Sequence, residues 1–240
     1  ESILLPDSLR RSARWGSAGL AGVWAQENTR ESIYDALARK ETFATSGPRI
    51  SLRFFGSFDY SAAMLDSTEL LQLAYARGVP MGGVLSNPAT QSAELASADS
   101  PAPTFILWAA KDPEGANLDR VQIIKGWVDA EGNSHETIFD VAVSSDRQRD
   151  ASGKVPAVGN TVDVAAATYD NSIGEGQLSA FWQDPEFDPA QEAFYYARAI
   201  EIPTPRWSTY DAMRLGVEAP DPVSIQERAI SSAIWYQVGE

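Results

Sequence analysis

From residue 103 onward, the chain repeats short stretches of alternating apolar and polar residues, and turn residues separate one stretch from the next. Alternation places every second side chain on the same face of a strand, and several such strands at short spacing are typical of an antiparallel β-sandwich. Residues 130–133 (Ala-Glu-Gly-Asn) join two of these stretches and predict a hairpin turn. The predicted strands cover residues 104–109, 121–129, 135–144, 161–169, 177–183 and 193–202.

The first hundred residues predict helices as well as strands. Asn28 and Glu31 have the spacing of a capping box at the start of a helix. Residues 50–55 alternate like a strand with one buried face. A second helix is predicted over residues 67–77, and Gly78 stands where a helix often ends.

Two further segments complete the predicted secondary structure. Residues 86–102 are small, polar and interrupted by proline, so we expect a surface loop. Near the end of the chain, Ser224 and Glu227 again have capping-box spacing and predict a short helix.

Charge and rare residues exclude several classes of function. The 240 residues include 33 acidic and 19 basic ones, and the resulting charge of −14 excludes a binder of nucleic-acid phosphates. Cysteine is absent, which excludes disulfides, thiolate metal sites and cysteine nucleophiles. His135 is the single histidine, so the chain cannot supply a cluster of histidine metal ligands. No apolar run is long enough to span a membrane.

His135 and the clustered carboxylates are the first candidates for chemistry. His135 lies at the predicted hairpin and would need an orienting carboxylate and a hydroxyl to act as a base, so we interpret it as a solvated turn residue. The carboxylates could form a glycosidase pair or a calcium loop, but solvated loop charge explains them better. They are Asp112, Glu114, Asp184, Glu186, Asp188, Glu218 and Asp221.

Aromatic residues on the predicted strands allow two interpretations. Exposed, they would form a platform on which sugars stack; facing inward, they would build the core of the sandwich. Alternation buries about half of the side chains on each strand, so we favour the core. These residues are Trp108, Trp127, Phe181, Trp182, Tyr195, Tyr196, Trp207 and Trp235.

Two arginines lie beside turns that proline makes rigid. Arg49 follows Thr45-Ser46-Gly47-Pro48, and Arg206 follows Pro203-Thr204-Pro205. A guanidinium held in this way suits an anionic group of a substrate, and it equally suits a structural salt bridge. The residues alone leave both interpretations open.

Eight segments of the chain resemble a bacterial protein family, domain-of-unknown-function family 3604. The resemblance extends from about Ser12 to Tyr236. Its segments are residues 19–25 (GLAGVWA), 27–32 (ENTRES), 39–49 (RKETFATSGPR), 78–83 (GVPMGG), 125–129 (KGWVD), 158–163 (VGNTVD), 201–208 (EIPTPRWS) and 225–228 (IQER).

The family resembles the PHP (polymerase and histidinol phosphatase) metallohydrolases, which implies a fold and an activity. It implies a distorted (β/α) barrel whose His and Asp residues hold divalent zinc, manganese or iron, with these ligands in an amino-terminal part outside this chain. No cofactor is then expected within the chain itself, and none of its residues is expected to ligate metal. The Thr-Ser-Gly-Pro turn resembles a barrel-exit segment close to the active site in PHP-like proteins.

The resemblance and the strand pattern together predict an α+β, mainly β chain. Residues 1–55 would be the terminal elements of a PHP-like barrel, residues 56–102 a helical insertion and loop, and residues 103–240 an antiparallel β-sandwich domain. We expect the carboxy-terminal fragment or subunit of a metal-dependent hydrolase that acts on a phosphate or carboxylic ester and is inactive in isolation.

The expected partners are the amino-terminal barrel and a small-molecule ester substrate, without nucleic acid or membrane. Thr45, Ser46, Arg49 and Arg206 are the predicted substrate-binding residues. A carbohydrate-binding β-sandwich module and a purely structural accessory domain are the alternatives.

Overall fold

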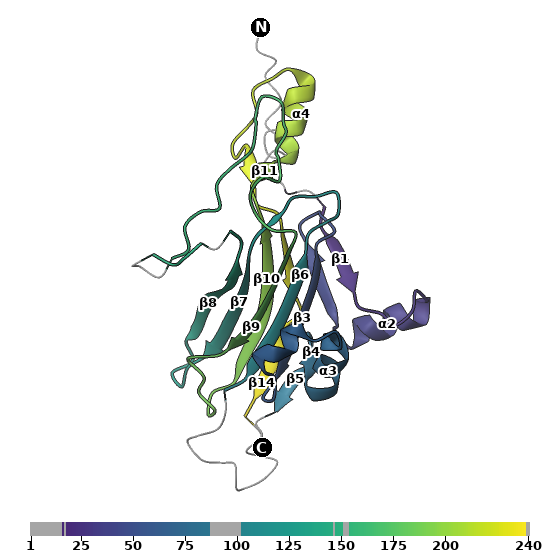
Figure 1. Cartoon of the computed structure of the whole chain (residues 1–240), viewed down its shortest axis with the longest axis vertical. Coiled ribbons are helices and arrows are strands. Elements are labelled where there is room, and N and C mark those ends of the chain that lie inside the picture. The colour runs from purple at the N-terminus through teal and green to yellow at the C-terminus, as the bar shows by residue number, and fades with distance from the viewer. Residues whose placement is uncertain (1–15, 17, 87–101, 146, 151–153, 239–240) are drawn as a thin grey trace.

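Two β-sheets packed face to face form the body of the molecule, and short helices lie at its margins (Figure 1). The computed structural model describes residues 16, 18–86, 102–145, 147–150 and 154–238. Within these residues the chain is mainly β and its sheets are almost wholly antiparallel, which confirms the predicted class. The predicted surface loop over residues 86–102 falls outside the described residues except at its two ends.

The larger sheet is built around β10 (Ala193–Glu201). One edge of β10 pairs along its whole length with β7 (Leu118–Val128), and β7 pairs in turn with β8 (Ser134–Val143). The other edge of β10 pairs first with β14 (Ile234–Gln237) and then with β13 (Arg228–Ser231). Two short strands therefore share the edge that faces away from β7.

Three strands from the first hundred residues extend this sheet. β2 (Thr42–Thr45) pairs with β13, and β1 (Leu20–Val23) pairs with β2. β5 (Val84–Ser86) joins β14 in the one parallel pairing of the named strands.

The smaller sheet has the order β4-β3-β6-β9. Its members are β4 (Val79–Pro80), β3 (Ser51–Ser57), β6 (Thr104–Ala110) and β9 (Gln177–Gln183). Its outer face is covered in part by the 3-10 helix η1 (Ala62–Asp66) and by α3 (Leu70–Arg77).

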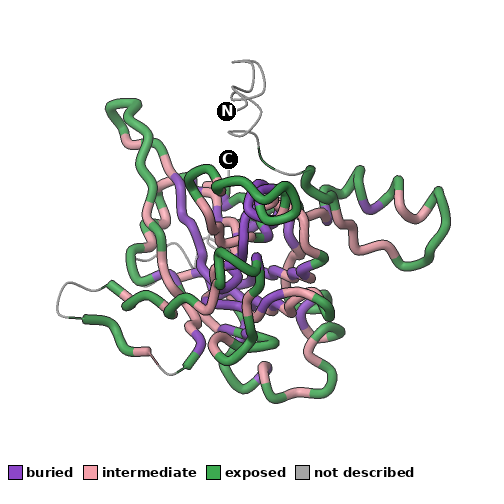
Figure 2. Tube along the Cα trace, turned by 90° about the horizontal axis from the view of Figure 1, so that it is seen from above, coloured by how far each residue is buried: buried purple, intermediate pink, exposed green. Residues whose placement is uncertain are grey.

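The main core lies between the two sheets, at the centre of the view in Figure 2. Phe54 and Phe105 of the smaller sheet stack there and lie beside Tyr195 of the larger one. A second, smaller cluster joins Phe55 and Ile106 to the covering helices. β3 and β6 are thus buried on both faces, which explains why β6 reads as a continuous apolar run (Thr-Phe-Ile-Leu-Trp-Ala-Ala) instead of alternating.

The sheets cross the boundaries predicted after residues 55 and 102. β2 and β3 precede residue 58, yet β2 pairs with β13 and β3 pairs with β6. Backbone hydrogen bonds between paired strands therefore join these segments to the rest of the sandwich. Both Thr42–Thr45 and Ser51–Ser57 are therefore strands of the sandwich.

The predicted helices form close to their expected positions. α2 (Arg30–Ala38) begins one residue later than predicted, because Thr29 and not Asn28 accepts a hydrogen bond from the Ser32 N–H. The helix extends away from the body and only its Ala36 is buried (Figure 2). Gly78 follows α3 as expected, but its backbone is extended; a side chain there would collide with the Tyr60 hydroxyl and the Gly56 carbonyl.

Two predicted elements are wrong. Residues 161–169 form no strand but a turn, in which Asp163 accepts hydrogen bonds from the N–H groups of Ala165 and Ala166. The helix predicted at Ser224–Glu227 is replaced by β12 (Ser224–Ile225), which pairs with β11 (Thr204–Pro205). A helix that was not predicted, α4 (Trp207–Leu215), follows β11.

No helix among the described residues combines the length and the apolar character that crossing a membrane requires.

Candidate functional site

The turn that carries three of the predicted site residues is held against β13. The Ser46 Oγ accepts a hydrogen bond of 2.8 Å from the Arg228 N–H, and the Ser46 N–H donates to the Arg228 carbonyl at 2.9 Å. Thr45 is buried and accepts from the Gly47 N–H at 3.3 Å. The hydroxyls of Thr45 and Ser46 thereby fix the conformation of the turn.

Arg49 ends this turn and contacts a carboxylate through its backbone. Its N–H donates to Asp112 Oδ2 at 2.8 Å, and the other Asp112 oxygen accepts from the Glu114 N–H at 3.1 Å. The hydrogen bond from Arg49 is the main reason that the pKa of Asp112 lies below its ordinary value. The guanidinium of Arg49 is exposed and makes no hydrogen bond or ion pair with any residue that the structure describes.

Glu201 lies nearby, at the end of β10. It is 1% exposed, and its Oε1 has no hydrogen-bond partner among the described residues. Burial, followed by the negative charges of Glu227 and Asp112, raises the pKa of Glu201 to about 8, while Lys111 opposes this change. The carboxyl group therefore keeps its proton at neutral pH. We call the region of Thr45, Ser46, Arg49, Asp112 and Glu201 the polar end of the sandwich.

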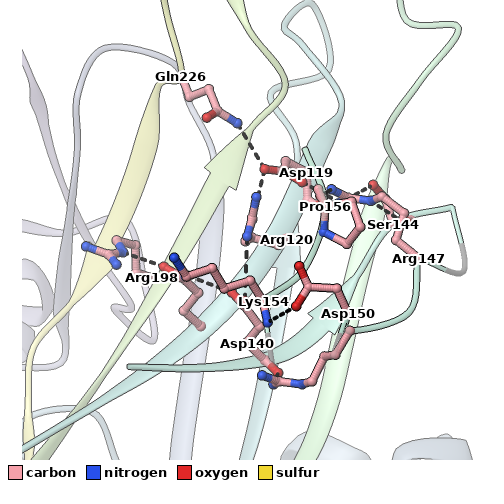
Figure 3. A network of polar contacts seen from close by, with 12 residues as sticks. Asp119, Arg120, Asp140, Ser144, Arg147, Asp150, Lys154, Pro156, Arg198 and Gln226 are labelled. Atoms are coloured by element: carbon pink, nitrogen blue, oxygen red, sulfur yellow. Dashed lines mark hydrogen bonds and ion pairs between the residues drawn. The ribbon is translucent and has the colours of Figure 1, made fainter. Parts of the chain in front are cut away.

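A hydrogen-bonded network underlies the polar end (Figure 3). Asp119, which is fully buried, accepts from Arg120 Nε at 2.9 Å, from Gln226 Nε2 at 3.0 Å and from Arg147. Gln226 also donates to the Glu201 carbonyl at 2.9 Å. The network ties three segments to the end of β10 and satisfies the buried charge, so it has a structural role.

Arg206 is buried, whereas Arg49 is exposed. It caps the start of α4, is 6% exposed, and donates from its guanidinium to Ser208 Oγ at 3.2 Å. Its guanidinium also lies 5.3 Å from the centre of the Trp207 ring. Of the two arginines that the sequence left open between substrate binding and structure, Arg206 has buried surroundings and Arg49 has an accessible charge.

The opposite end of β10 contains a buried ion pair that sequence analysis missed. Asp184, expected to be a solvated loop residue, is 2% exposed and lies 2.7 Å from Lys125 Nζ. Tyr195 donates its hydroxyl to the same carboxylate at 2.7 Å, and its burial and the charge of Asp184 raise its pKa. The prediction of solvated charge is therefore wrong for Asp184, because its loop folds back over the core.

His135 is more ordered than a solvated turn residue. Its ring stacks on Trp127 at 5.3 Å between ring centres, and its Nε2 lies 2.6 Å from Asp129 Oδ2. Asp129 also accepts from the Asn133 N–H at 2.7 Å, and these hydrogen bonds lower its pKa. An orienting carboxylate is thus present, but none of the described residues offers His135 a hydroxyl to activate.

The described residues contain no group of three histidine, aspartate or glutamate side chains placed to hold a metal ion. The charges of Asp112 and Glu227 act on Glu201, but the three residues do not form such a group.

Comparison with known proteins identifies a family. The family model described as a protein of unknown function (DUF3604) matches residues 6–238. No curated protein and no solved structure matches the chain.

Proposed function

The chain belongs to the DUF3604 family of proteins of unknown function, and we propose that it is the carboxy-terminal, non-ligating region of a PHP-like metal-dependent hydrolase. In this proposal the polar end of the sandwich lines the substrate site. The amino-terminal barrel lies outside this chain and is its partner, and the substrate is a small phosphate or carboxylic ester.

The observation that supports this proposal most strongly is the accessible charge of Arg49. Its backbone N–H is held by Asp112, while its guanidinium makes no hydrogen bond or ion pair in the described part of the chain and acts on Asp112 only through its charge. A guanidinium can form two parallel hydrogen bonds to an anionic group, and its planar shape reduces the entropy that is lost for each hydrogen bond. Arg49 would therefore bind the anionic oxygens of a phosphate ester, and Thr45 and Ser46 would position it.

Asp112 and Glu201 determine the charge around that arginine. Asp112 carries a negative charge, because its pKa is lowered, whereas Glu201 is neutral at pH 7. A neutral Glu201 leaves less negative charge to repel an anionic substrate than two ionised carboxylates would. A divalent zinc, manganese or iron ion, held outside this chain, would supply an activated water molecule for attack on the ester.

Steady-state kinetics of the full-length protein test the proposal. We expect Arg49→Ala to raise the KM for phosphate esters by about ten-fold or more, which corresponds to the loss of a charged hydrogen bond. Arg214→Ala is the matched control, because that exposed arginine of α4 makes only a 3.9 Å pair with Asp211. An unchanged KM in Arg49→Ala would favour the purely structural alternative.

A further inference from the structure

A groove of about 560 Å³ lies at the end of the sandwich opposite the polar end. It is formed where β10 begins, between the end of β7, the loop before β10, and β14. Trp127, Phe194 and Trp235 contribute aromatic surface to it, and Gln191, Glu192 and Gln237 contribute polar groups. We call this feature the aromatic groove.

Trp235 is the accessible ring of the groove. It is 48% exposed, the largest exposed fraction of any described tryptophan, and it lies 5.3 Å from Phe194. Phe194 lies over Gly126 on the neighbouring strand, where a β-carbon would collide with the ring. The glycine therefore allows the phenyl ring to lie low on the sheet and to support one side of the indole.

The polar groups of the groove fall into two kinds. The Asp129 carboxylate is already bound by His135 and Asn133, and it holds the rim in shape. The side chains of Gln191, Glu192 and Gln237 make no hydrogen bond to any residue that the structure describes. Two primary amides and one carboxylate thus remain available to a ligand.

From this combination we propose that the aromatic groove binds a neutral saccharide. An indole face packs against the C–H face of a sugar ring, and amides both donate to and accept from sugar hydroxyls. The groove residues include Asp129, Asp188 and Glu192 but no lysine or arginine, so an anionic sugar is repelled. The amide donors distinguish the groove from a cage for an organic cation. This inference does not depend on the hydrolase proposal.

Isothermal titration calorimetry of the full-length protein tests the inference with four neutral probes: cellohexaose, xylohexaose, mannohexaose and laminarihexaose. We expect at least one to bind with a Kd in the micromolar to millimolar range and to change the tryptophan fluorescence. Trp235→Ala should weaken that binding by about ten-fold or more. Tyr34→Ala is the matched control, because this aromatic residue is 70% exposed on α2, outside the groove.

Gln191→Ala provides a second variant that removes no ring, and it should weaken binding several-fold through the loss of a hydrogen bond to the sugar. The inference is overturned if none of the four neutral probes binds, or if Trp235→Ala binds as tightly as Tyr34→Ala. Binding of choline in place of the sugars would also overturn it, since that result would identify a cation site.

Discussion

The two ends of β10 differ in which groups they bury and which they leave accessible. At the polar end, the carboxyl of Glu201 is buried without a partner for its Oε1 in the described chain, and the cation of Arg49 is accessible. At the aromatic groove, the charges of Lys125 and Asp184 are buried together, and Trp235 is accessible. About 25 Å of strand separates the two regions, as nine residues of β-structure require.

The difference shows how one scaffold can hold two separate surfaces. Each end contains a buried ionic cluster. The Asp119 network lies at the polar end, and the Lys125–Asp184 pair lies at the end with the aromatic groove. The accessible groups are Arg49 at the polar end, and Trp235, Gln191 and Gln237 in the aromatic groove.

Removing one partner of the Lys125–Asp184 ion pair should have the largest effect on stability. Lys125→Met leaves the buried Asp184 without its cation and should lower the free energy of unfolding by about 3–5 kcal/mol. Urea denaturation of the full-length protein measures this change. The double variant Lys125→Met/Asp184→Asn removes both charges and should recover part of the loss; a double variant as unstable as the single one would contradict the account.

Glu201 should make the stability of the protein depend on pH between about 4.5 and about 8. Its folded pKa of about 8 lies above the ordinary value of 4.5, so its contribution to stability is full below pH 4.5 and is lost as the pH rises to 8. Within that window the stability should fall by about 1 kcal/mol per pH unit.

Glu201→Gln, which cannot ionise, isolates this effect. The difference in unfolding free energy between the wild type and Glu201→Gln should grow in favour of the variant from about pH 5 to about pH 8. Urea denaturation at several pH values measures it, and parallel curves for the two proteins would show that Glu201 is not the group that titrates.

Gly126→Ala should have an intermediate effect, confined to the groove end. The added methyl group would displace the Phe194 ring, at a cost of about 1–3 kcal/mol in the free energy of unfolding. Gly176→Ala is the matched control, because no atom lies within 4 Å of a β-carbon built there. Thermal denaturation should show that Gly126→Ala is clearly less stable than Gly176→Ala. Equal stability of the two variants would show that the Phe194 ring does not pack closely against Gly126.

Much of the sandwich could be predicted from sequence because alternation is a local signal. The strands expected at 104–109, 177–183 and 193–202 agree with β6, β9 and β10 to within one residue. At residues 161–169 the same signal failed, since Asp163 caps a turn in which Ala167 has φ +50°. At Ser224 the capping-box pattern predicted a helix, but the residue forms a strand that pairs with Pro205, nineteen residues earlier in the chain.

The candidate site was only partly predictable, for a different reason. Proline beside Arg49 and the resemblance to a known family indicated the turn, and the structure joins Thr45, Ser46 and Arg49 in it. Glu201 gave no signal, because a glutamate at the end of a strand is usually solvated. Its raised pKa depends on its burial at the end of β10 and on the charges of Glu227 and Asp112, which only the folded chain brings together.

The central claim is that the accessible guanidinium at the polar end binds the anionic part of an ester. The KM of the full-length protein for phosphate esters, compared between Arg49→Ala and Arg49→Lys, tests it most directly. The account predicts a KM raised by about ten-fold or more in Arg49→Ala and partly restored by the lysine, which keeps the charge but loses the paired hydrogen bonds. Identical KM values for the wild type and both variants would contradict it.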